Sequence, residues 1–312
     1  MKKISSYLLV GMVLASAVSC SNSEYKKTKS GLLYKIISDK SNPVVKKGEF
    51  LKLQYTQKLR DSLLYSTYDG GMPVYPQVDS ARPVYSPTEI FPLFRKGDSA
   101  VVVELADTLQ RRFGGQLPPF IKKKDKITIT FKVLDVFSSP DAKQKDMEDE
   151  LVKQKQREIT TVESYLAKNS INAEKTTKGT YVVVQSVGDG PQVDSGKEVS
   201  VRYTGKMLPS GKVFESNMTG PGNEPFKFVV GKGQIIPGWD DGLRKFKKGG
   251  KGTLYIPAFL AYDQQPGPGR KPFENLIFDV EIVDVTDPKP TPPAPPAGQM
   301  PQGMQAPPPA HR

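Results

Sequence analysis

The side chains that could do chemistry in this chain are mainly aromatic and lie close together in the sequence. Between Val199 and Val285, strands of alternating apolar residues, one helical turn with Trp239 and a Pro/Gly-rich loop follow one another. The single histidine, His311, lies in a Pro-rich tail, and the single cysteine, Cys20, ends an N-terminal apolar run. The sequence therefore excludes a histidine-based triad and a zinc cluster. It favours an aromatic cleft that uses neither metal nor cofactor.

The elements that position this cleft are predicted from periodicity. Apolar residues alternate from Val199 to Tyr203 and again from Leu276 to Ile282, as in half-buried antiparallel strands. Pro237 can begin a helical turn. That turn places three apolar side chains on one inward face, namely Trp239, Leu243 and Phe246. We expect the sheet to wrap around this short helix.

A second, earlier segment repeats the same order of motifs. Tyr55 in Leu53–Leu59 matches Tyr203, 148 positions later, and Gly97 matches Gly249, 152 positions later. The strand from 127 to 136 likewise matches the strand from 276 to 285. Because the offset drifts so little over several segments, the two halves are predicted to be diverged copies of one unit.

The segment between the copies should be helical. Residues from Asp141 to Lys168 contain no Gly or Pro and are densely charged, with an incomplete apolar stripe. We interpret this helix as a spacer. A dimerisation helix is the less favoured alternative, because the apolar positions do not sustain a heptad.

Both ends of the chain carry signals that are independent of the fold. Lys2, Lys3 and a mostly apolar run predict a signal peptide over residues 1–19, and therefore export. The stretch Ala17–Cys20 resembles a bacterial lipobox, which implies lipidation of Cys20. Cleavage after Ala17, giving a soluble periplasmic protein, is the alternative. Residues 287–312 are rich in Pro, Ala, Gly and Gln, which predicts a disordered tail.

The net charge of +12 does not indicate a nucleic-acid partner, because the Lys and Arg residues are scattered along the chain. Without a second cysteine, no intramolecular disulfide can form. We interpret the charge as general solvation.

The second copy resembles the FKBP family of peptidyl-prolyl cis/trans isomerases over about residues 176–286. The resemblance rests on motifs in family order: Val201–Gly205, Gly211–Ser216, Pro225–Phe228, Gly231–Trp239, Ile256–Pro257 with Leu260–Tyr262, and Leu276–Glu281. It implies an α+β fold of two FKBP-like domains, each an antiparallel β-sheet around a short α-helix. A degenerate domain over 24–140 and an isomerase domain over 176–286 would be joined by a helical linker over 141–170.

The resemblance also implies roles for individual residues. Four would form the catalytic set: Tyr203, Glu215, Trp239 as the floor, and Tyr262 as a hydroxyl donor to a bound backbone carbonyl. Five would form the apolar wall that binds the substrate: Phe214, Phe226, Ile235, Ile236 and Phe278. The implied partners are X-Pro segments of exported proteins, with macrolide inhibitors as further candidate ligands.

This sequence departs from the family pattern at three places. Glu215 stands where aspartate is usual, Asp263 replaces a glycine after Tyr262, and Arg270–Phe273 replaces an Ile-Pro-Pro segment. The basic loop predicts a preference for clients with an apolar or acidic residue beside proline. In the first copy, Pro87 and Gln110 fall at the positions of Trp239 and Tyr262. That copy is expected to be inactive and to act as a spacer, client-binding module or dimerisation module.

The function expected from the sequence is a prolyl isomerase that assists the folding of exported proteins. Its location would be a cell-envelope membrane, through a lipid anchor and facing the periplasm. The alternative is a non-catalytic protein-binding or chaperone module anchored to the cell envelope. An intact series of motifs from Tyr203 to Trp239 favours the enzyme.

Overall fold

The computed structural model describes residues 24–288, apart from 69–70, 80–83, 115–117, 220–222 and 268–269. The chain divides into two compact units, of which unit 1 ends at Leu151 and unit 2 begins at Val152. The signal peptide, Cys20 and almost all of the predicted tail lie outside the described residues. Within the part of the chain that is described, no helix is both long and apolar enough to cross a membrane.

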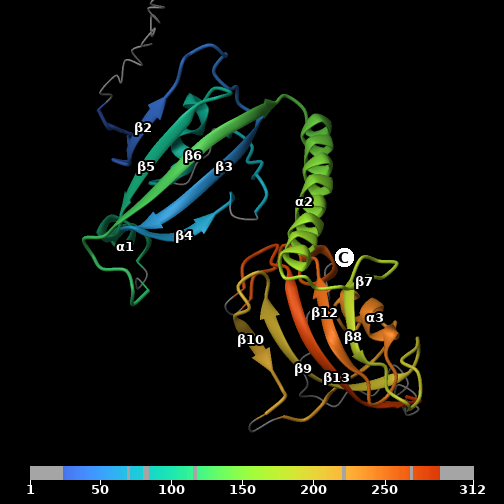
Figure 1. Cartoon of the computed structure of the whole chain (residues 1–312). Helices are drawn as coiled ribbons and strands as arrows, with labels where there is room; N and C mark the ends of the chain where they lie inside the picture. Colours follow the sequence, from blue (N-terminus) through green and yellow to red (C-terminus); the bar gives the residue numbers. More distant parts are fainter. Residues whose placement is uncertain are drawn as a thin grey trace, which may run out of the picture. The chain divides into compact units, whose positions relative to one another are not determined.

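Unit 1 contains an antiparallel sheet with the strand order β1-β2-β5-β6-β3-β4 (Figure 1). The bounds of its elements are β1 Lys26–Lys27, β2 Leu33–Ile37, β3 Phe50–Leu59, β4 Ser62–Ser66, the 3₁₀-helix η1 Pro87–Leu93, β5 Ser99–Leu105, α1 Ala106–Phe113 and β6 Lys126–Phe137. Helix α2, Pro140–Lys168, begins in unit 1 and ends in unit 2.

Unit 2 repeats this topology, with the order β7-β8-β12-β13-β9-β10 and with β11 also paired to β9. Its elements are β7 Glu174–Lys175, β8 Tyr181–Ser186, β9 Glu198–Met207, β10 Val213–Ser216, β11 Phe226–Val229, α3 Pro237–Gly242, the 3₁₀-helices η2 Leu243–Lys245 and η3 Ala258–Leu260, β12 Lys251–Ile256 and β13 Leu276–Thr286. Corresponding strands have the same order in the two sheets, as expected for two copies of one unit. The expected α+β fold with antiparallel sheets is confirmed.

Two apolar layers cover the sheet of unit 2. Leu254 of β12 and its partner Phe278 of β13 point to one face of the sheet and belong to the main core, together with Trp239 of α3. Their neighbours Tyr255 and Ile277 point to the opposite face, as the two-residue period of a strand demands. On that face they pack with Val162 and Leu166 of α2, among others.

The second half of α2 is therefore part of unit 2. The incomplete apolar stripe of the predicted linker helix packs on one side, where Val162 is fully buried and Leu166 nearly so. Residues 152–168 provide one of the two layers that cover the sheet of unit 2. The compact unit accordingly begins well before Thr176, where the resemblance to the family begins.

Unit 1 differs from the expected sheet around a short α-helix in one element. The position of α3 is taken by the 3₁₀-helix η1, which carries Pro92 in its interior. Proline has no N–H to donate and its ring crowds the preceding turn, so an α-helix is disfavoured there. Ser86 and Glu89 form a capping box that fixes the start of η1.

Candidate functional site

Eight of the nine predicted cleft residues line one cavity of about 230 Å³ in unit 2. They come from β9, β10, β11, α3, the segments before α3 and after η3, and β13. The lining residues are Tyr203, Glu215, Phe226, Ile235, Ile236, Trp239, Tyr262 and Phe278. Phe214, the ninth, does not line the cavity. It packs edge-to-face on Phe278, with 5.9 Å between the ring centroids.

Trp239 lies at the centre of this aromatic cluster. Helix α3 starts with Pro237 at its first turn, and Trp239 is only 2% exposed. Its ring meets Tyr203 and Phe278 edge-on, at centroid distances of 5.0 and 5.2 Å. The indole N–H has no hydrogen-bond acceptor among the described residues. The cavity is thus built on a close-packed aromatic floor.

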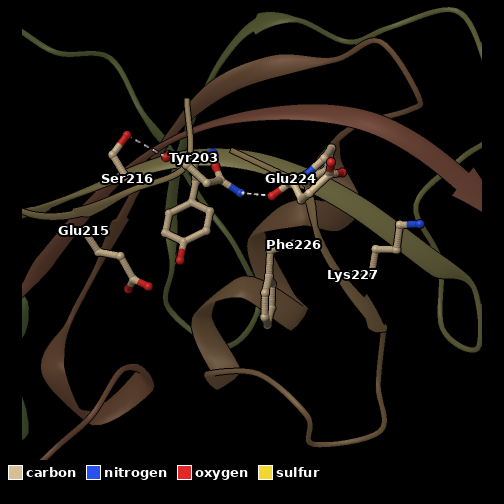
Figure 2. Close-up of a pocket in the computed structure, with 8 residues that line it drawn as sticks. Tyr203, Glu215, Ser216, Glu224, Phe226 and Lys227 are labelled. Atoms are coloured by element: carbon tan, nitrogen blue, oxygen red, sulfur yellow. Dashed lines mark hydrogen bonds between the residues drawn. The ribbon is translucent and has the colours of Figure 1, made fainter. Parts of the chain in front are cut away.

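Asn217 fixes the strand that carries Tyr203. Its side-chain oxygen accepts from the Tyr203 backbone N–H at 2.6 Å, and its amide donates to the carbonyls of Val201 and Glu224. The Ser216 hydroxyl also donates to the Tyr203 carbonyl, at 3.2 Å. Figure 2 shows the Tyr203 and Phe226 rings pointing to the same side, with Glu215 beside the Tyr203 hydroxyl.

Two phenolic hydroxyls face the cavity as neutral groups. Burial raises the pKa of Tyr203 well above its ordinary value. The Glu215 carboxylate raises this pKa further, through its hydrogen bond with the hydroxyl and through its negative charge. Burial likewise raises the pKa of Tyr262, with Arg270 opposing the shift and Glu215 adding to it. Both side chains therefore keep their proton, and can donate hydrogen bonds, over the physiological pH range.

Arg270 lies over the rim of the cavity. Its guanidinium carbon is 3.6 Å from the Tyr262 ring centroid and 5.5 Å from that of Phe214. Among the described residues, no ion pair is found for Arg270. A positive charge without a carboxylate partner therefore stands beside one of the two hydroxyl donors.

A second hollow, of about 590 Å³, adjoins the first and shares Tyr203, Glu215 and Phe226 with it. Its remaining lining runs along the β10–β11 connection: Ser216, Asn217, Glu224, Pro225 and Lys227 (Figure 2). Two adjoining hollows that share a wall form a cleft longer than one side chain. Such a cleft can hold an extended peptide on either side of the residue that enters the aromatic cavity.

The chemistry open to this site is conformational. None of the eight residues that line the cavity is a histidine, cysteine, serine or lysine. Rotation about a peptide bond needs no nucleophile, because its barrier of roughly 18–20 kcal/mol arises from amide resonance. An apolar cavity disfavours the more polar planar amide relative to the twisted one, and fixed neutral donors can hold the twisted geometry.

In unit 1, the tyrosine that matches Tyr203 packs against other aromatic rings. Tyr55 stacks on Tyr65 at 5.2 Å between centroids, and Phe131 lies 5.8 Å from Tyr55 and 5.6 Å from Phe91. Phe131 is the β6 partner of Tyr55, whereas the β13 partner of Tyr203 is the smaller Val280. The two substituted positions lie in η1 and α1 respectively, Pro87 as the first residue of η1 and Gln110 inside α1.

Sequence reasoning missed Asn217, and it named the basic Arg270–Phe273 loop without predicting that Arg270 stacks on Tyr262. Asn217 has a local signal, since an Asn next to a Gly/Pro-rich connection commonly bonds to nearby backbone. The stacking of Arg270 on Tyr262 has none, because only the fold of the 263–273 loop brings the two side chains together.

Comparison with known proteins agrees with this geometry. Residues 190–283 match the family model described as FKBP-type peptidyl-prolyl cis-trans isomerase. FK506-binding protein 3 of Yarrowia lipolytica is 44% identical over 107 residues, which are 34% of this chain and 25% of that protein. A peptidyl-prolyl cis-trans isomerase of Saccharomyces cerevisiae is 41% identical over 107 residues, with the same coverage of 34% and 25%.

Among solved structures, FkpA from Escherichia coli shares 29% identity, with a TM-score of 0.37, over 47% of this chain and 71% of that one. The chain spans about a quarter of the length of the first curated relatives it matches. The match to those relatives is confined to roughly a third of this chain, 34–36% in each of the three, and the family match lies within unit 2. The match to the FKBP-type peptidyl-prolyl cis-trans isomerase family model thus covers residues 190–283, the segment of unit 2 that carries all eight residues lining the cavity.

Proposed function

We propose that unit 2 catalyses cis/trans isomerisation of X-Pro bonds in exported client proteins. The observation that carries this proposal is the aromatic cavity with Trp239 as its floor and Tyr262 as a neutral donor at its wall. Uncatalysed isomerisation takes tens to hundreds of seconds and can limit folding. A folding protein outside the cytoplasm would therefore gain from such a catalyst.

An isomerisation assay on the full chain tests this function. Tyr262→Phe should lower kcat/KM about five- to tenfold, since one hydrogen bond to the twisted amide is lost. Trp239→Ala should lower it further by opening the floor. Tyr68→Phe, which removes a hydroxyl from an exposed tyrosine of unit 1, is the matched control. A folded wild-type chain that binds X-Pro peptides without turnover would instead support the non-catalytic binding module.

The Arg270 side chain supports a preference for clients with an acidic residue beside proline. Its charge is not neutralised by a described carboxylate and lies next to the Tyr262 donor. A Glu-Pro peptide should have a higher kcat/KM than a Lys-Pro peptide, and added salt should reduce the difference. Arg270→Gln should remove the preference. Lys271→Gln, which removes a charge from the exposed neighbour, should leave it in place.

Unit 1 is proposed to bind clients or partners without catalysis, because Pro87 and Gln110 stand where unit 2 has the cavity residues Trp239 and Tyr262. In a full-length chain that carries both Tyr262→Phe and Trp239→Ala, unit 1 should then add no isomerase activity to what the altered unit 2 retains. If this double variant isomerised a substrate that the site of unit 2 cannot process, the activity would have to be assigned to unit 1.

The N-terminal sequence supports export and attachment to the cell envelope through Cys20. Radiolabelled palmitate should be incorporated into the wild-type chain expressed in a bacterium and should be absent from Cys20→Ser. Label absent from both would favour cleavage after Ala17 and a soluble periplasmic form.

A further inference from the structure

The turn that carries Tyr262 is held from outside by helix α2. This turn begins with η3, whose first backbone N–H groups have no acceptor within so short a helix. Pro257, which precedes η3, provides no side-chain cap. The Ala258 N–H instead donates to the Asn275 side-chain oxygen at 2.9 Å, and the Phe259 N–H donates to Oε2 of Glu158 at 2.8 Å.

Glu158 belongs to the part of α2 that lies in unit 2 and is only 2% exposed. Its other carboxylate oxygen accepts from Gln154 at 2.8 Å. Its backbone carbonyl accepts from the amide of Asn275 at 3.1 Å. One residue of α2 thus bonds to both groups that start the turn, directly to Phe259 and through Asn275 to Ala258.

A second contact from the preceding helical turn reinforces the first. The Lys155 ammonium lies 5.8 Å from the Phe259 ring centroid, and its charge also acts on Asp263, the residue after Tyr262. Helix α2 thus contacts Phe259 through both Glu158 and Lys155, three residues before Tyr262. Within the turn, the Asp263 N–H donates to the Ala258 carbonyl at 2.9 Å, which closes the loop around Tyr262.

We infer that Glu158 is a positioning residue of the isomerase site, acting through the 258–263 turn on the Tyr262 hydroxyl. This inference rests on the proposed function, because it assigns Glu158 a share in placing a catalytic donor. It makes helix α2 a functional part of the isomerase unit, although the helix lies outside the segment that matches the family. A buried carboxylate without hydrogen-bond donors would be costly, and the Phe259 N–H and the Gln154 amide offset this cost for Glu158.

Three substitutions separate this role from general packing. Glu158→Ala removes the acceptor and should lower kcat/KM, by no more than the five- to tenfold loss expected for Tyr262→Phe and mainly through kcat, because Tyr262 acts on the twisted amide. Glu158→Gln keeps an acceptor oxygen of the same reach and should recover most of the loss. Glu163→Gln is the control, since Glu163 is an exposed carboxylate on the same helix that contacts Lys175 and Tyr181 rather than the turn.

A double-mutant cycle tests the route through Tyr262. If Glu158 acts by placing that hydroxyl, Glu158→Ala should have little further effect on kcat/KM in a Tyr262→Phe chain. Effects that multiply would overturn the inference, as would a Glu158→Ala chain with wild-type kcat/KM and unchanged Trp239 fluorescence. A uniform loss of stability with unchanged kinetics of the folded fraction would reduce Glu158 to a structural residue.

An NMR readout separates this inference from the proposed function. In the full chain, Glu158→Ala should accelerate hydrogen exchange of the Phe259 amide and shift the ring resonances of Tyr262, whether or not the wild type turns over substrate. An inactive wild type with these changes would refute the isomerase and leave the positioning intact. An active wild type in which Glu158→Ala causes neither NMR change would support the isomerase and refute the positioning role of Glu158.

Discussion

At the scale of single residues, the site depends on groups that keep one protonation state. The hydroxyls of Tyr203 and Tyr262 are both buried enough to raise their pKa values above that of free tyrosine. Neither can be the origin of a pH profile near neutrality. The donors at the cavity wall are therefore constant over a wide pH range.

This constancy leads to a kinetic prediction. With a peptide that carries no ionisable group beside proline, kcat/KM should be unchanged from about pH 7 to pH 9.5, because the tyrosines stay protonated. Exchange NMR on a peptide with one X-Pro bond measures it without a coupling protease. A fall with a midpoint between pH 8 and pH 9 would show that a cavity tyrosine ionises.

Glu104 of β5 gives unit 1 a pH-dependent stability. Burial raises the pKa of this carboxyl from 4.5 to about 7. The folded state then holds the proton more tightly than the unfolded state, so the free energy of unfolding falls as the pH rises from about 4.5 to about 7 and is flat above. The size of the effect is on the order of 3 kcal/mol.

Glu104→Gln should remove this dependence. Calorimetry at pH 5 should find unit 1 of the variant about as stable as that of the wild type, and at pH 8 clearly more stable. Glu148→Gln, at an exposed position of α2, should change neither. Equal stabilities of wild type and Glu104→Gln at pH 8 would contradict the raised pKa.

At the scale of elements, the cavity floor depends on the close approach of α3 to β12. A Cβ at Gly238 would lie 2.4 Å from Cγ2 of Ile256 and 3.1 Å from the Leu260 carbonyl. Real side chains do not approach so closely, so the helix must move away from the strand. Trp239 is the next residue and would move with it.

Gly238→Ala should therefore destabilise unit 2 by about 1–3 kcal/mol and reduce isomerase activity. Urea unfolding followed by the fluorescence of Trp239, the only tryptophan of the chain, measures this. Ile256→Ala alone should cost about 2–5 kcal/mol. The double variant should cost less than the sum of the two, because the clash partner is gone; strict additivity would exclude the clash.

At the scale of the whole molecule, each unit has its own apolar core. The core of unit 1 includes Leu51 and Phe94, whereas the main core of unit 2 includes Trp239 and Leu254. Among the described residues, the buried apolar side chains of unit 1 form one cluster and those of unit 2 form two. Each unit should therefore unfold in a transition of its own.

Leu51→Ala tests this independence. The substitution should destabilise unit 1 by about 2–5 kcal/mol, because it leaves a cavity at a fully buried position. The urea midpoint reported by Trp239 fluorescence should not change, while hydrogen exchange in β3 and β6 should accelerate. A parallel shift of the Trp239 midpoint would show that the two units unfold together.

The sequence by itself determined the repeated unit, the alternating strands and the helical turn that carries Trp239. These features are local, because a two-residue apolar period, a proline that begins a helical turn and the order of motifs can be read without knowing what packs where. The nine cleft residues were implied by the resemblance to a family, which rests on the order of the motifs, and eight of them line one cavity.

Only the tertiary structure decided what surrounds that set. Glu158 looks like any other charge in a charged helix, and its partner Phe259 is 101 positions away. Arg270 over Tyr262 and Phe131 against Tyr55 likewise depend on how distant segments meet. A sequence pattern records which side chains prefer burial, but it does not record their partners, because partners are fixed by the packing of elements far apart in the chain.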